Sequence, residues 1–139
     1  MFGRNILSSV AVEIGASRTR VFQKNMGETF SAPTLIAFRR GRPRTDSNIV
    51  CIGEDAHPLI GRAPTSVEVV RPVANGAIVD TEATVLYINR IMSQAIPGFW
   101  VAKPRIICAV PSASTLVTRT AFSEVFRNLG CTDVKMVPQ

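Results

Sequence analysis

One stretch of sequence decides the predicted fold: Val10-Ala11-Val12-Glu13-Ile14-Gly15-Ala16-Ser17-Arg18-Thr19-Arg20-Val21-Phe22. An apolar, β-prone run ends at an acid, a glycine and two small residues, and a second β-prone run follows at once. We therefore predict strands over 10–14 and 19–23, joined by a tight turn with exposed backbone N–H groups. Such a turn suits a phosphate; the alternative is an ordinary hairpin turn.

The remaining pattern alternates strands and helices. Prolines and glycines between Gly53 and Pro72 indicate loops and a short helix around 54–59. Ile106–Val110 is a continuous apolar run, as expected of a strand covered on both faces. The other expected elements are strands over 28–32, 34–38, 49–52 and 134–137, a helix from Asp80 to about Gln94, and a helix from Ser114 or Thr115 to Gly130.

Several further segments keep their order and approximate spacing with one known family. They are Ser31–Ala37, Ile52–Ala56, Leu59–Pro64, Val70–Pro72, Asn75–Asp80 and Val110–Ser112. Together with the turn at 15–18, they resemble the MreB family of bacterial actin homologues over almost the whole chain.

The resemblance implies an α/β fold, the ribonuclease-H-like half of the actin and Hsp70 ATPase fold. Residues 1–32 and 73–139 would form subdomain IA, and residues 33–72 the smaller, β-rich insertion called IB. Family members continue with a second phosphate loop and an adenosine pocket. We expect this second lobe to be absent from the present chain.

The resemblance also implies a nucleotide site, with ATP and Mg²⁺ bound weakly or not at all by this chain alone. Glu13 stands where the family has an aspartate that helps to hold magnesium; alternatively it only ends a strand. Asp80 matches a second cleft acid, although we favour a role as helix cap. The residues that match the family's phosphate turn are Gly15, Ala16, Ser17 and Arg18.

Efficient hydrolysis is not expected. The family places a glutamate at the position of Thr118 to orient the attacking water. A threonine hydroxyl can bond water, but it is no carboxylate base at neutral pH. The alternative is that Thr118 is simply a first-turn helix residue, and we assign no catalytic residue.

A membrane contact is predicted after the first long helix, where Pro97 and Gly98 stop the helix. Phe99, Trp100 and Val101 would then lie in a loop beside basic Lys103 and Arg105, which suits an interfacial anchor on anionic lipid. The corresponding family loop inserts into the inner membrane; the alternative is that Trp100 folds onto the core. Met1–Leu7 is a second candidate, or a frayed terminus.

Composition sets the broad class. The chain has 139 residues, of which 46% are hydrophobic and 19% charged, as in an ordinary globular domain. No run approaches a membrane span, and no secretion signal is visible. Three widely spaced cysteines are expected to be reduced, and the single histidine argues against a zinc site. We expect a cytoplasmic protein, peripheral on the inner face of the membrane.

The net charge of +6 suggests an anionic partner. Much of it lies in Arg39-Arg40-Gly41-Arg42-Pro43-Arg44, which we interpret as a solvated hairpin tip. Nucleic acid is not expected, because no aromatic residues are interleaved with the arginines. The predicted partners are copies of itself, full-length MreB-like protomers and anionic lipid.

The predicted function is that of a cytoskeletal protein that forms or regulates membrane-associated filaments and so affects cell shape. One alternative is the first half of a split ATPase that needs a second chain. The other is a basic nucleic-acid-binding domain.

Overall fold

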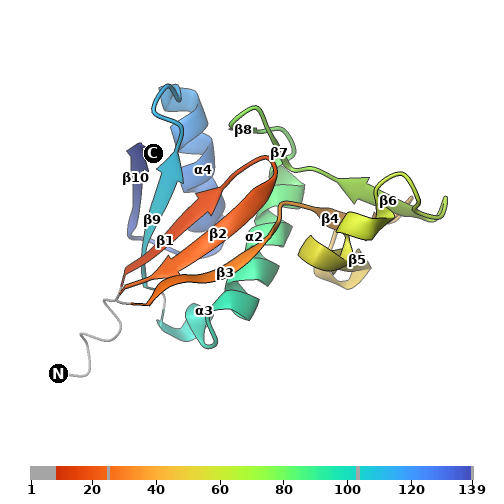
Figure 1. Ribbon diagram of the computed structural model, residues 1–139, viewed down its shortest axis with the longest axis horizontal. Helices are drawn as coiled ribbons and strands as arrows, with labels where there is room; N and C mark the ends of the chain where they lie inside the picture. Colours follow the sequence, from red (N-terminus) through yellow and green to blue (C-terminus); the bar gives the residue numbers. More distant parts are fainter. Residues whose placement is uncertain (1–8, 25, 103, 139) are drawn as a thin grey trace.

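Two sheets of different size organise the molecule. The computed structural model describes residues 9–24, 26–102 and 104–138. A five-stranded sheet is built from residues 9–33 and 105–138, and a three-stranded sheet from residues 36–70. The small sheet projects to one side of the large sheet (Figure 1).

The large sheet has the strand order β10-β9-β1-β2-β3. The first three strands pair antiparallel through short turns, whereas β1, β9 and β10 pair in parallel and need longer crossovers. This order confirms the predicted meander followed by alternating helices and strands. The bounds are β1 (Ser9–Ile14), β2 (Arg18–Gln23), β3 (Gly27–Pro33), β9 (Arg105–Val110) and β10 (Val134–Pro138).

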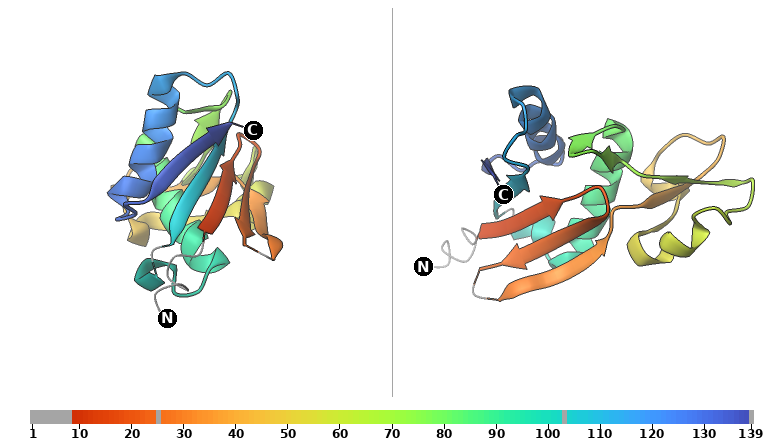
Figure 2. Two further views of the ribbon diagram at one scale, coloured as in Figure 1. Left: turned by 90° about the vertical axis from the view of Figure 1, so that its left-hand side faces the viewer. Right: turned by 45° about the horizontal axis from the view of Figure 1, so that its top comes forward.

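Helices α2 (Thr81–Ala95) and α4 (Leu116–Asn128) lie on one face of the large sheet (Figure 2). Their apolar stripes, with Ile88 and Phe126 fully buried, pack against Val12 and its neighbours in the core. Burial alternates along β9, where Ile106 is buried and Ile107 only half-buried. The prediction that this strand is covered on both faces is therefore wrong within the described chain.

The helix ends follow the predicted caps. An Asp80 carboxylate oxygen accepts a 3.0 Å hydrogen bond from the Ala83 amide, and the Thr115 hydroxyl accepts one of 3.1 Å from the Thr118 amide. Gly130, just after α4, has a φ of 93°, a left-handed conformation that suits glycine.

The small sheet has the order β5-β4-β6 and its own core around Leu35 and Ala56. The predicted helix around 54–59 is instead two short 3-10 turns, because Pro58 lacks the amide that a continuous α-helix needs there. Strand β6 was missed, since its Val-Glu-Val-Val run lies between prolines. The bounds are β4 (Ile36–Arg39), η1 (Asp46–Asn48), β5 (Ile49–Ile52), η2 (Gly53–Asp55), η3 (His57–Leu59) and β6 (Val67–Val70).

Two short elements complete the fold. Strands β7 (Val73–Ala74) and β8 (Ala77–Ile78) pair across a turn at Asn75 and Gly76, both of which have positive φ. Residues Phe99–Ala102 form a one-turn helix, α3, so the predicted loop there is wrong. In the described ranges, no helix has the length and apolarity required to cross a bilayer.

A buried polar cluster joins the two sheets to helix α2. Thr19 and Thr34 share a 2.9 Å hydrogen bond between their hydroxyls, and the Tyr87 hydroxyl donates to the Pro33 carbonyl at 2.7 Å. All three polar side chains are fully buried. Because buried polar groups are costly when unpaired, this cluster fixes how the chain passes from β3 into the small sheet.

Replacing Tyr87 with phenylalanine is expected to lower the free energy of unfolding by about 1–2 kcal/mol, because one buried hydrogen bond is lost without a cavity. Burial raises the pKa of Tyr87 to about 12. The unfolded state therefore loses its proton first, and the tyrosine's contribution should fall as pH rises from about 10 toward 12. Urea unfolding across this range tests both points, since the variant should lack this alkaline loss. Identical stability and pH profiles for the two proteins would contradict the prediction.

Candidate functional site

The turn between β1 and β2 is held in place at both ends. The Gly15 amide donates to the Arg18 carbonyl at 2.9 Å, and the Thr34 amide donates to the Ser17 carbonyl at 3.0 Å. A Cβ atom on Gly15 would lie 3.0 Å from the same Arg18 carbonyl oxygen. Any larger residue would press on this carbonyl, so glycine suits the close backbone approach.

The turn borders an open hollow of about 560 Å³, which we call the loop hollow. Ala16 and Ser17 are exposed, and neither backbone amide bonds to another described residue. Free amides in a glycine-containing turn fit a phosphate group. The lining residues are 13–18, Arg20, Gly76, Ala109 and Pro111.

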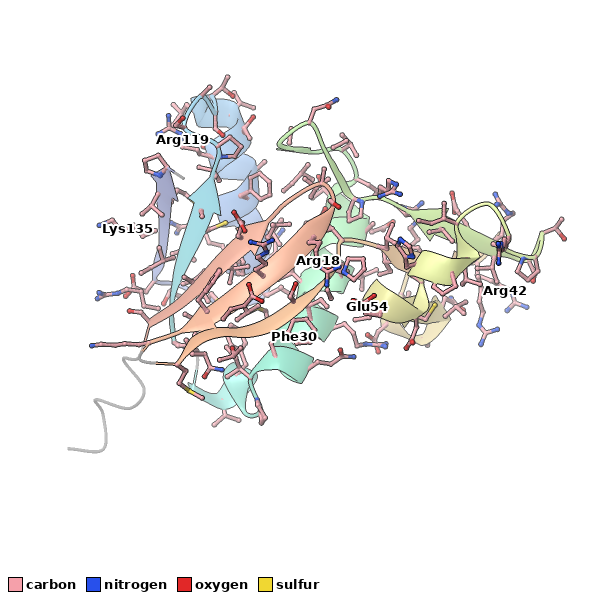
Figure 3. All side chains as sticks on the ribbon, viewed as in Figure 1. Arg18, Phe30, Arg42, Glu54, Arg119 and Lys135 are labelled. Carbon is pink, nitrogen blue, oxygen red and sulfur yellow. The ribbon has the colours of Figure 1, made fainter. Side chains whose placement is uncertain are left out.

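Arg18 borders the loop hollow, but its guanidinium is bonded to residues outside the hollow. Its guanidinium donates to the Ser31 hydroxyl at 3.0 Å and to the Glu54 carboxylate at 3.1 Å. The side chain thus reaches toward the small sheet, as Figure 3 shows. The structure therefore offers the backbone of the turn, rather than this guanidinium, to a phosphate.

Glu13 lies in the loop hollow opposite Arg20 on the neighbouring strand. One of its carboxylate oxygens is 3.9 Å from the Arg20 guanidinium, which also lies 3.8 Å from Glu28. These are long, exposed ion pairs, so each contributes little to stability. The Glu13 residue thus borders the hollow beside the turn.

Asp80 is not among the residues that line the loop hollow. One carboxylate oxygen caps helix α2 through Ala83, and the other is paired with Arg44. Burial alone would raise the pKa of Asp80, but hydrogen bonds from Arg44 and Ala83, and the charge of Arg44, lower it overall. The structure thus confirms the cap and does not bring the two predicted metal ligands together.

A magnesium site made by protein side chains alone does not fit these residues. In the described chain, no group of three or more His, Cys, Asp or Glu residues is placed to hold a metal ion. Magnesium that is bound mainly by phosphate oxygens and water needs only one or two carboxylates. Glu13 fits that more limited role, which stays a prediction.

Thr118 lies in the first turn of α4 and does not line the loop hollow. Its hydroxyl accepts a 3.1 Å hydrogen bond from the Thr115 hydroxyl, and its amide donates to the same Thr115 oxygen. These contacts are those of a capped helix start, which is the plainer of the two interpretations of this residue.

The residues predicted to contact the membrane differ in how exposed they are. Phe99 is fully buried and packs in the core, so its predicted place in a membrane-inserting loop is corrected. Val101 is 91% exposed on α3. Trp100 belongs to the same short helix, and Lys103 lies outside the described residues. Arg105 is paired with Asp133 at 2.9 Å.

Sequence reasoning missed several residues of the loop hollow. Gly76 and Pro111 reach it from loops far apart in the sequence, and an added Cβ on Gly76 would lie 3.3 Å from the Pro111 ring. Both belong to segments that carried the family resemblance. The family resemblance therefore identified these segments, but only the tertiary fold shows that they border one hollow.

An antiparallel meander that leads into alternating helices and strands, with both long helices on one face of the sheet, is the ribonuclease-H-like half of an actin-like fold. Two solved structures share this fold: MreB5 of Spiroplasma citri bound to AMPPNP, with a TM-score of 0.79 at 21% identity, and the same protein bound to ADP, with 0.80 at 20%. Each comparison covers 95% of this chain and 38% of the solved chain.

The family model described as MreB/Mbl protein matches residues 7–139, so the chain belongs to the MreB/Mbl family. The cell shape-determining protein MreB of Haemophilus influenzae is 27% identical over 133 residues, and that of Escherichia coli 25%. The cell shape-determining protein Mbl of Bacillus subtilis is 24% identical over 130 residues. The chain spans 38% of the length of these MreB relatives and 37% of Mbl.

Proposed function

We propose that this chain is the first-lobe portion of an MreB-type cytoskeletal protein that joins or regulates membrane-associated filaments and is degenerate in ATP hydrolysis. Residues 1–32 and 73–139 would correspond to subdomain IA, and residues 33–72 to subdomain IB. The single observation that carries the proposal is the turn at 15–18, whose free amides border the loop hollow within an MreB-like fold.

Nucleotide binding by this chain is proposed to rest on the turn's backbone, with Glu13 beside it. Phosphoryl transfer depends on groups that hold phosphate and metal from several sides. Here, one side of the phosphate would be contacted, and Thr118 offers no carboxylate for the attacking water. Weak binding without hydrolysis therefore fits the described residues best.

Isothermal titration with Mg-ATP tests this proposal. We expect a dissociation constant in the millimolar range and no phosphate release above the buffer blank. Micromolar affinity would show that the described residues hold the nucleotide far better than we infer. Hydrolysis that appears only on adding a complementary second-lobe chain would identify half of a split ATPase instead.

Membrane attachment is proposed to use the exposed part of α3. Val101 projects from the surface, while Phe99 anchors the same turn in the core. Replacing Val101 with serine should weaken co-sedimentation with phosphatidylglycerol vesicles several-fold without loss of folding, since only exposed apolar area is removed. Val79→Ser is the matched control, because Val79 is also exposed, at 62%, but lies away from α3. Equal binding by both variants and the parent would remove the α3 contact.

A further inference from the structure

The small sheet region carries more positive charge than its own acids neutralise. Between residues 36 and 71 there are six arginines and four acids. Two of these acids pair with arginines from outside the region: Asp46 with Arg90 at 3.1 Å, and Glu54 with Arg18 at 3.1 Å. Glu68 pairs with Arg44 at 3.6 Å. The region is therefore left with a surplus of unpaired guanidinium groups.

Two of these arginines meet at an open hollow of about 540 Å³, beside the turn η3 and just beyond β6. Its lining residues are His57, Pro58, Ile60, Arg62 and Arg71, and none of them is acidic. Although the Arg62 amide donates to the Leu59 carbonyl, neither the Arg62 nor the Arg71 guanidinium has an ion pair or a hydrogen bond to another described residue.

The other arginines of the region differ in their surroundings. Arg40 donates to the Thr65 and Val67 carbonyls, and Arg44 is held by Asp80, Glu68 and the ring of Phe38. The guanidinium groups of Arg40 and Arg44 therefore stabilise the fold, whereas those of Arg62 and Arg71 make no such internal contacts. Arg42 lies at the far end of the small sheet from the large sheet (Figure 3).

The chemistry of the hollow selects among anions. A guanidinium fork binds two oxygens side by side, so one fork already uses both oxygens of a carboxylate. A phosphodiester likewise has only two unesterified oxygens, whereas inorganic phosphate or a phosphate monoester has enough for two forks at once. Pro58 and Ile60, the latter 40% exposed, add apolar contact for whatever the phosphate is attached to. The volume exceeds that of a bare phosphate, which leaves room for such a group.

We propose that the hollow lined by His57, Arg62 and Arg71 binds a phosphate monoester group, carried either by a soluble organic phosphate or by a lipid headgroup. This site is separate from the loop hollow, which none of these three residues lines. The proposal therefore does not depend on nucleotide binding at the turn.

The test is an NMR titration of the full chain with inorganic phosphate, followed through the arginine Nε–H signals at constant ionic strength. The site variant is Arg62→Gln with Arg71→Gln; the matched control is Arg39→Gln with Arg42→Gln, which removes the same charge from exposed positions of the same region. We expect saturable shifts of Arg62 and Arg71 in the parent and the control, and at least tenfold weaker binding in the site variant. Equal weakening in both variants, or shifts that do not saturate, would overturn the proposal.

Vesicles distinguish the two sources of phosphate. If the site variant alone binds phosphatidic acid vesicles at least tenfold more weakly than the parent, the headgroup is the ligand. If all three proteins bind vesicles equally while the parent still saturates with inorganic phosphate, the ligand is a soluble phosphate. Both results support the site, and loss of vesicle binding in the control alone would contradict it.

Discussion

Replacing Asp80 with alanine is expected to lower the free energy of unfolding by about 2–3 kcal/mol, the sum of a lost helix cap and a lost, partly buried ion pair. The side chains of Asp80 and Arg44 are 25% and 23% exposed, so solvent screens their pairing only in part. Urea unfolding at neutral pH measures the loss.

The substitution Asp80→Asn separates the two contributions. Asparagine can still accept the Ala83 amide bond but carries no charge, so it should cost only about 1–2 kcal/mol through the lost ion pair. Parent-like stability in the asparagine variant would show that the pairing with Arg44 contributes nothing. Arg44→Gln completes the double-mutant cycle, in which the two losses should not add.

The pH dependence of this difference has a definite sign. The pKa of Asp80 lies below its usual value of 3.8 in the folded state, so the contribution of its charged form is complete above that value. It is lost as pH falls through the lower, folded-state pKa. The stability gap between the parent and Asp80→Asn should therefore be constant near neutrality and should close in acid. A gap unchanged at low pH would show that the charge of Asp80 is not its cause.

Local patterns predicted most of the fold. The strands at 10–14 and 19–23, the capped helix after Asp80 and the helix stop at Gly130 each depend on residues within a few positions of one another. The prediction failed where packing decides the outcome. Phe99 begins helix α3 with its side chain fully buried, and the open face of β9 depends on where two distant helices lie.

The candidate site was predictable in its turn but not in its side-chain partners. Gly15 and its neighbours are local, and the family resemblance located them. In contrast, Arg18 meets Glu54, and Arg44 meets Asp80, across 36 residues of sequence in each case. Such pairings decide which charged side chains remain free to bind a ligand. They cannot be predicted from the spacing of residues in the sequence.

Replacing Gly15 with valine is expected to abolish measurable binding of phosphate compounds at the turn, a loss of more than tenfold. The new Cβ would lie 3.0 Å from the Arg18 carbonyl oxygen, the same oxygen that the Gly15 amide bonds at 2.9 Å. Either this carbonyl or the turn must move, and the amides of Ala16 and Ser17 move with it. Amide NMR shifts of these two residues during an ATP titration report the change directly.

Ser17→Ala is the matched control for this prediction, because it removes a side-chain hydroxyl from the same turn and keeps every backbone amide. If backbone N–H groups bind the phosphate, as the free amides suggest, this variant should bind ATP within twofold of the parent. A large loss with Ser17→Ala, alongside normal binding by Gly15→Val, would assign binding to the hydroxyl and refute the backbone cradle. Gly15 does not belong to α3 and does not line the hollow at Arg62 and Arg71. Gly15→Val should therefore leave vesicle binding by α3 and phosphate binding at that hollow unchanged.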